Sequence, residues 1–136
     1  MVTSEEDQIN VLIMEEKSMD ELMNAFYLMW ESFPGTARLI RKDRTILASN
    51  AFAKMVGFVP DVKCVMVGSP EIHKGCRVNE MFRTGSYQVV KSENGTLRYW
   101  LPVPGHDDVY VHVTFNPNSI EGMVLFPTPI EKKAVE

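Results

Sequence analysis

The stretch that decides the fold is FPGTARLIRKDRTILASNAFAKMVGF, residues 33–58. Pro34-Gly35 ends a long helical pattern, and the spacing of apolar residues changes after it. Two short strands around a polar turn, followed by a short helix, are predicted at residues 36–41, 45–49 and 50–55. Gly57 ends that helix. This change from helix to hairpin predicts a domain that mixes helices with an antiparallel sheet.

Upstream of this stretch the sequence has the pattern of an amphipathic helix. Positions spaced alternately by three and four carry Ile9, Leu12, Glu16, Met19, Met23, Phe26, Trp30 and Phe33. Only Glu16 interrupts this apolar seam, which has the spacing of a coiled coil. A capping group at residues 4–7 favours one continuous helix, whereas Ser18 followed by Glu21 leaves open a break into two. We expect the seam either to lie on the domain's own sheet or to pair with a second copy, and we assign residues 1–33 as a dimerisation helix.

Downstream of the stretch, residues 58–70 are irregular and residues 71–83 are predicted to form a helix. Beyond Gly85 the pattern is one of strands joined by turns. The predicted strands span residues 87–91, 96–103, 109–115 and 122–126. Apolar and polar residues alternate along 109–115, which is typical of a half-buried strand.

Composition limits the class of protein. The 136 residues fit one domain, and contents of 45% hydrophobic and 24% charged residues are typical of a soluble globular protein. The net charge of −4 and the absence of a basic cluster argue against nucleic-acid binding. The N-terminal run MVTSEEDQ does not resemble a signal peptide, and no apolar run reaches about 18 residues. We therefore expect no membrane span, and a cytoplasmic location.

The predicted order is a long helix, two strands, short helices and then three or four antiparallel strands, which indicates an α+β fold with one sheet. This order resembles a PAS sensor domain. The resemblance rests on residues 33–58, where two strands around a charged turn precede Asn50, Phe52 and a helix that ends at Gly57. Further along, TFNPN (114–118) resembles the end of the family's penultimate strand, and EGMVLF (121–126) resembles its last strand.

The resemblance covers about residues 33–127. It implies a five- to six-stranded antiparallel sheet with short helices on one face and the amphipathic helix at the N-terminus. Residues 34–130 are assigned to the PAS-like domain and residues 131–136 to a tail. Members that feed an output domain commonly end in an Asp-Ile-Thr-like signature, whereas this chain has Thr128-Pro129-Ile130 and ends soon after. Output is therefore expected to pass through a homodimer or to a separate signalling protein.

A curved sheet capped by short helices leaves a concavity, which is where small ligands or cofactors bind. The expected wall residues are Phe52, Met55, Met81 and Phe82 from the helices and Tyr99, Leu101, Val111 and Val113 from the sheet. His112 lies on the opposite face of its strand from Val111 and Val113, and it either orients a ligand or faces solvent. The identity of any ligand or cofactor stays open.

Both cysteines lie in KCVMVGSPEIHKGC, residues 63–76, together with His73. Thiolate and imidazole are the usual zinc ligands, but no C-x2-C pair is present and at most three ligands are near, so no metal site is predicted. Three readings remain open: a redox pair of Cys64 and Cys76, packing of both thiols as small hydrophobes, and a haem ligand at His73. The last follows from the resemblance, because haem-binding PAS domains often take an imidazole from this region.

The sequence lacks the motifs of the common enzyme classes, such as G-x-S-x-G, the P-loop, G-x-G-x-x-G and H-E-x-x-H. We therefore expect a non-enzymatic PAS-like sensory or regulatory module. It would bind a small ligand or cofactor, or sense redox state, and signal through a dimer or a partner. The alternative is a small α+β enzyme that uses the same concavity.

Overall fold

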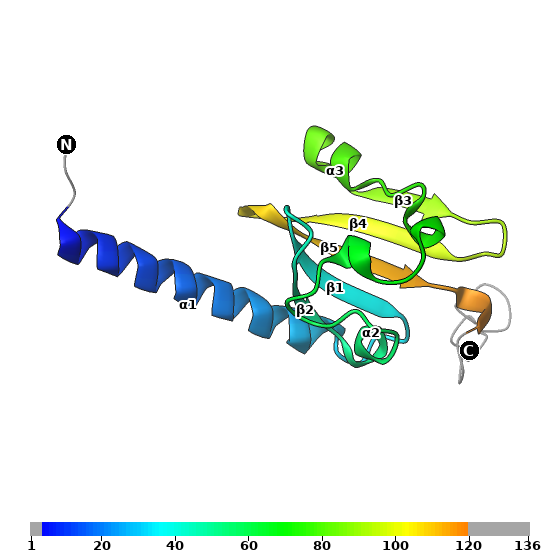
Figure 1. The fold of residues 1–136 in the computed structure, drawn as a ribbon, viewed down its shortest axis with the longest axis horizontal. Coiled ribbons are helices and arrows are strands. Elements are labelled where there is room, and N and C mark those ends of the chain that lie inside the picture. The colour runs from blue at the N-terminus through cyan, green and yellow to red at the C-terminus, as the bar shows by residue number, and fades with distance from the viewer. Residues whose placement is uncertain (1–3, 120–136) are drawn as a thin grey trace, which may run out of the picture.

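The structure is a computed structural model that describes residues 4–119, except for the side chain of Ile72. Five antiparallel strands form one sheet in the order β2-β1-β5-β4-β3 (Figure 1). The strands are β1 (Thr36–Arg41), β2 (Ile46–Ser49), β3 (Gln88–Lys91), β4 (Leu97–Val103) and β5 (His106–Phe115). The helices are α1 (Glu5–Trp30), α2 (Ala51–Met55) and α3 (Val78–Thr84), with 3₁₀ turns at Cys64–Met66, Pro70–His73 and Pro117–Ser119. The predicted α+β fold is confirmed, with five strands in the described part.

The helix α1 is unbroken over 26 residues, which confirms a single long helix. Ser4 caps its start, because the Ser4 side chain accepts a hydrogen bond from the Asp7 backbone N–H at 3.1 Å. The C-terminal half of α1 lies on the sheet, where Phe26 is buried, whereas the N-terminal half extends past the edge of the sheet (Figure 1). None of the helices within residues 4–119 is long and apolar enough to cross a membrane.

Each face of the sheet has its own apolar core, and the outer one is only partly buried over β4 and β5. On the outer face α1 covers a core that includes Phe26, Ala37, Leu39, Ala48, Val109 and Val113. On the inner face the short helices cover a core of Ile40, Ile46, Ala53, Phe58, Cys64, Val78, Met81, Trp100 and Tyr110. Successive strand residues point to opposite faces, so Leu39 packs toward α1 while Ile40 points inward.

The predicted helix over residues 71–83 is wrong in its first half. Pro70–His73 forms a 3₁₀ turn, and α3 begins only at Val78. Gly75 lies between them with φ of 78°, a left-handed conformation that cannot continue a right-handed helix. The chain from Cys64 to α3 is therefore a loop with two short turns.

The run TFNPN (114–118) contains the end of β5, which ends at Phe115 and is followed by the 3₁₀ turn Pro117–Ser119. Among the described strands, β5 lies at the centre of the sheet, between β1 and β4. The predicted strand over residues 122–126 and the tail at 131–136 lie outside the described residues.

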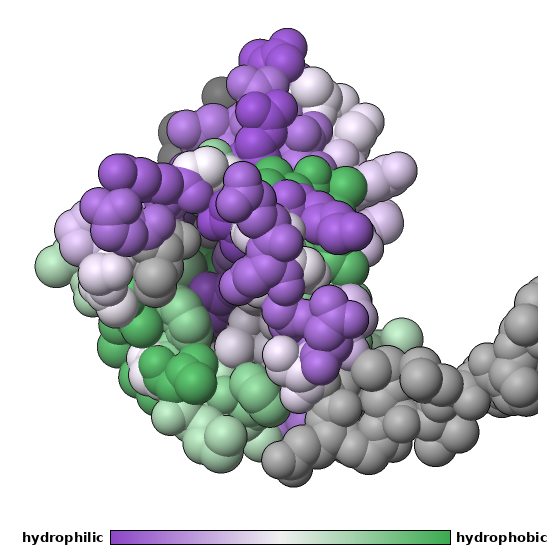
Figure 2. All heavy atoms as spheres, turned by 90° about the vertical axis from the view of Figure 1, so that its right-hand side faces the viewer, coloured by the Kyte–Doolittle hydropathy of each residue, from purple (hydrophilic) through white to green (hydrophobic). Residues whose placement is uncertain are grey.

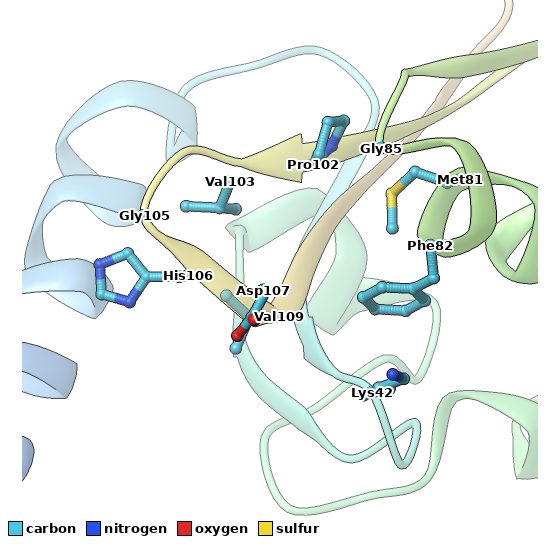
Figure 3. A pocket seen from close by; sticks show the side chains of 10 residues that line it. All are labelled: Lys42, Met81, Phe82, Gly85, Pro102, Val103, Gly105, His106, Asp107 and Val109. Atoms are coloured by element: carbon cyan, nitrogen blue, oxygen red, sulfur yellow. The ribbon is translucent and has the colours of Figure 1, made fainter.

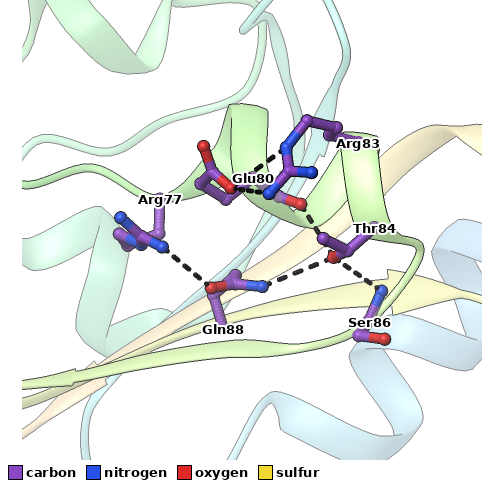
Figure 4. Close-up of polar contacts among 6 residues, drawn as sticks. All are labelled: Arg77, Glu80, Arg83, Thr84, Ser86 and Gln88. Carbon is purple, nitrogen blue, oxygen red and sulfur yellow. Dashed lines mark hydrogen bonds and ion pairs between the residues drawn. The ribbon is translucent and has the colours of Figure 1, made fainter.

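Polar contacts join α3 to β3 at the edge of the sheet (Figure 4). Gln88 on β3 accepts a hydrogen bond from Arg77 at 3.5 Å and donates one to Thr84 Oγ1 at 3.5 Å. Thr84 Oγ1 also donates to the Glu80 carbonyl at 2.8 Å and accepts from the Ser86 backbone N–H at 3.2 Å. These contacts hold α3 over the inner face of the sheet.

Candidate ligand-binding site

A row of polar side chains crosses the inner face of the sheet. The strand register places, in order across all five strands, Ser49, Arg38, His112, Trp100 and Gln88. Directly opposite residues share a face with Cβ atoms about 5 Å apart, so these side chains are neighbours. Within residues 4–119, Ser49 Oγ, Arg38 Nε and Trp100 Nε1 are buried and make no hydrogen bond. Each such atom costs about 1–3 kcal/mol, and so many in one row point to a functional site.

A hollow of about 370 Å³ opens beside this row, between the sheet and the Pro70–His73 turn. Its lining residues are Thr36, Arg38, Phe58, Glu71, His73, Lys74, Ser92, Thr96, Arg98, His112 and Thr114. Figure 2 shows this end of the molecule, where hydrophilic residues predominate and hydrophobic ones gather lower, at the level of α2. The volume lies at the lower end of the range for small-molecule pockets, roughly 300–1,000 Å³.

Arg38 is the buried charge of the hollow, with 3% of its surface exposed. Its Nη2 donates to Thr114 Oγ1 at 3.2 Å, and its Nη1 lies 3.5 Å from Cys64 Sγ. The guanidinium carbon lies 4.0 Å from the centre of the Phe58 ring. Burial lowers the pKa of Arg38, yet a guanidinium stays protonated at neutral pH. The hollow therefore holds a positive charge that touches only uncharged groups.

His112 lies directly opposite Arg38 and stacks on Trp100, with ring centres 4.7 Å apart. Its Nδ1 lies 2.8 Å from the Tyr99 carbonyl oxygen and donates to it, since a carbonyl only accepts. Burial, and then the charge of Arg38, lower the pKa of His112 well below its usual value. The ring is thus neutral at pH 7, and its Nε2 carries a lone pair that accepts a hydrogen bond.

The two cysteines and His73 differ in exposure and in contacts. Cys64 is buried against Arg38, Cys76 is exposed, and both thiols are free. Burial raises the pKa of Cys64, so its thiol stays protonated. His73 Nε2 donates to the Val67 carbonyl at 2.7 Å, which ties the loop beside the hollow. No group of three or more His, Cys, Asp or Glu side chains in the described part of the chain is placed to hold a metal ion.

The four sheet residues expected to line the concavity face the other way. The side chains that belong to the outer core or pack against it are Tyr99, Leu101, Val111 and Val113. This placement corrects the expected face. The alternation along β4 and β5 was read correctly, but its apolar set lies on the outer face, and the inner positions of the same strands include Trp100, His112 and Thr114.

The residues expected from the helices are divided among three places. His73 lines the hollow beside Arg38. Met81 and Phe82 line a second hollow of about 560 Å³ at the opposite end of the sheet. Figure 3 shows them reaching from α3 toward the β4–β5 turn, where His106 points away toward α1. Phe52 and Met55 are 42% and 77% exposed on α2 and line a third hollow of about 600 Å³, outside the first two.

Asn50 joins the site to the helices. Its Oδ1 accepts hydrogen bonds from the backbone N–H groups of Ala37 at 3.1 Å and Ala53 at 2.9 Å. Its Nδ2 donates to the carbonyls of Trp30 at 3.1 Å and Gly35 at 2.9 Å. One fully buried amide thus links the end of α1, the start of β1 and the start of α2.

No protein-family model matches this sequence, and no curated protein matches it. Among solved structures the chain is similar to a sensory box sensor histidine kinase from Vibrio cholerae, with a TM-score of 0.51 and 11% identity. The match covers 79% of this chain and 93% of that one. The fold is PAS-like. The resemblance predicted from residues 33–58 is thereby confirmed at the level of the fold, which is all that 11% identity shows.

Proposed function

We propose that this PAS-like chain is a sensory module that binds a small polar ligand in the hollow beside Arg38 and His112. The observation that carries this proposal is a buried, positively charged side chain that lines an open hollow and has no charged partner. A ligand that supplied the missing partner would offset the cost of burying the charge. The similarity to a sensory box protein supports a role in sensing.

The signal would pass through the sheet to α1. Arg38 points into the hollow, whereas its neighbours Ala37 and Leu39 belong to the outer core with Phe26. A shift of β1 toward a ligand would therefore change the packing of α1, and Asn50 would carry the shift to the end of that helix. Such coupling requires the ligand to bind one of the two packings more tightly.

Native mass spectrometry of freshly purified protein tests ligand binding. We expect a retained small molecule as added mass on the chain. Ser92→Trp places a large ring at a residue that lines the hollow and should abolish that mass. Ser86→Trp, at an exposed serine outside the hollow, is the matched control and should keep it. Added mass that survives Ser92→Trp would place the ligand elsewhere and contradict the proposal.

We further propose that the N-terminal half of α1 pairs with a second copy of this chain. Ile9, Leu12 and Ile13 are 55%, 58% and 56% exposed on the part of α1 that extends past the sheet. Ile9 and Leu12 belong to the same apolar seam as Phe26, which is buried against the sheet further along α1. Heptad spacing is the pattern by which two helices pair, and a helix with apolar residues on several sides is normally covered.

Light scattering after size-exclusion chromatography tests this pairing. We expect a dimer for the wild type and a monomer for the double variant Ile9→Glu/Leu12→Glu. Leu28→Glu is the control, because Leu28 is 89% exposed on the same helix but lies off the seam, and it should remain a dimer. A monomeric wild type at tens of micromolar would contradict the pairing.

A further inference from the structure

The charge of Arg38 has no compensating anion in the described part of the chain. The ion pairs there join Lys63 to Asp43, Lys74 to Glu71 and Arg83 to Glu80, and none includes Arg38. Glu71, the carboxylate that lines the hollow, forms an ion pair near the surface with Lys74, whose Nζ lies 3.0 Å from Glu71 Oε2. Cys64 stays a protonated thiol because of its burial.

The rest of the lining adds positive charge. Arg98 and Lys74 line the hollow beside Arg38, and Arg98 Nη1 donates to the Lys74 carbonyl at 3.2 Å, which holds both at the rim. His112 is neutral. Lys74 is paired with Glu71, so the carboxylate of the lining does not neutralise Arg38. The buried positive charge of Arg38 favours an anionic ligand and opposes one that carries an ammonium group.

The position of His112 adds a second requirement. Arg38 and His112 are directly opposite on β1 and β5, so their Cβ atoms are about 5 Å apart. Arg38 offers donors, whereas His112 offers the acceptor Nε2, because its Nδ1 donates to the Tyr99 carbonyl. A ligand that satisfies both needs an anionic group and a hydrogen-bond donor close together. Phe58, which lines the hollow, supplies apolar surface for a carbon skeleton.

We propose that the hollow binds a small 2-hydroxy carboxylic acid, with its carboxylate on Arg38 and its hydroxyl donating to His112 Nε2. This inference rests on the proposed function and names the class of its ligand. A guanidinium fork matches the planar carboxylate, and the adjacent hydroxyl lies within the short span that separates the two side chains. A volume of about 370 Å³ suits an acid of this size with one ring or a short chain.

Isothermal titration with three related probes tests the ligand class. Mandelate carries both groups, phenylacetate lacks the hydroxyl, and mandelamide replaces the carboxylate by a neutral amide. We expect the wild type to bind mandelate about 10- to 100-fold more tightly than mandelamide and about 3- to 10-fold more tightly than phenylacetate. Arg38→Met should remove the preference for acid over amide. His112→Phe, which keeps an aromatic ring on Trp100, should remove only the preference for the hydroxyl.

The controls separate ligand class from folding. Arg41→Met removes the same charge from the same strand at an exposed residue outside the hollow, and it should keep the wild-type preferences. Should Arg38→Met not fold, Arg38→Lys keeps the charge and should weaken mandelate binding by about fivefold through loss of the fork. Equal affinity for mandelate and mandelamide, acid preference that survives Arg38→Met, or no binding of any probe would overturn the hydroxy-acid assignment. The proposed function would survive those results if native mass spectrometry still showed a ligand that Ser92→Trp displaces.

Discussion

Replacing Arg38 by Met should make the ligand-free protein more stable. Arg38 is 3% exposed and its partners are the uncharged side chains of Thr114, Cys64 and Phe58. Removal of its charge relieves a desolvation cost of several kcal/mol. Met has a similar length and packs well against an aromatic ring. A structural arginine would behave in the opposite way, so the sign of the effect decides between the two roles.

The expected size follows from the contacts that are lost. The hydrogen bond to Thr114 contributes about 1 kcal/mol and the cation–π contact with Phe58 at most about 2 kcal/mol. Replacing a buried ion pair by apolar residues of similar volume is often neutral or stabilising by about 1–4 kcal/mol, and Arg38 has no partner charge to offset its burial. We expect the free energy of unfolding to rise by about 1–3 kcal/mol. For a domain of this size, that raises the melting temperature by roughly 4–12 °C.

Urea unfolding followed by circular dichroism measures this change, with both proteins first refolded from denaturant to remove any retained ligand. The slope with urea should be equal for the two proteins, so that the midpoint reports stability. Arg41→Met is the control and should change the free energy of unfolding by less than about 0.5 kcal/mol. A loss of about 3–5 kcal/mol on Arg38→Met would refute the reasoning, because that is the cost of breaking a buried pair.

Three further variants test other parts of the account by the same measurement. The folded state keeps His112 neutral, while the unfolded chain takes up a proton at this residue below about pH 6.5. The free energy of unfolding of the wild type should therefore fall between pH 6.5 and 5, by up to roughly 1.4 kcal/mol per pH unit. His112→Phe should flatten this slope, and an unchanged slope would exclude His112 as its source. Asn50→Ala should lower the free energy of unfolding by about 3 kcal/mol or more, because it leaves buried backbone groups unpaired; a loss below about 1 kcal/mol would contradict the junction role. Gly35→Ala should lower the free energy of unfolding by about 1–3 kcal/mol, since the added Cβ would lie 2.6 Å from the Thr114 carbonyl oxygen. An unchanged free energy of unfolding would mean that the backbone of β5 shifts there at no cost and would contradict this prediction.

The elements of the fold could be predicted from local signals. Heptad spacing and Ser4 predicted α1, and Asn50 and Gly57 marked both ends of α2. Turn residues separated the strands, because their conformations are chemical requirements that act over a few residues. The 71–83 helix was wrong in its first half, because the left-handed backbone of Gly75 ends any helix there.

The face of the sheet that carries the site could not be predicted. Alternation shows that Val111 and His112 point to opposite faces, but not which helices cover each face. Here both faces carry an apolar core, and α1 packs on the outer one, while the site lies on the inner face. One signal was present: Arg38 stands between apolar neighbours in the strand TARLI, where a charge has no solvent-exposed face unless the site needs it.

A crystal structure of the protein with mandelate is the most direct test of the central claim, which is that Arg38 binds the carboxylate of an acidic ligand. We predict a carboxylate within about 3 Å of the Arg38 guanidinium and the hydroxyl at the same distance from His112 Nε2. A structure of the soaked protein in which the Glu71 carboxylate has turned inward onto Arg38, or in which the acid lies on surface lysines, would contradict it.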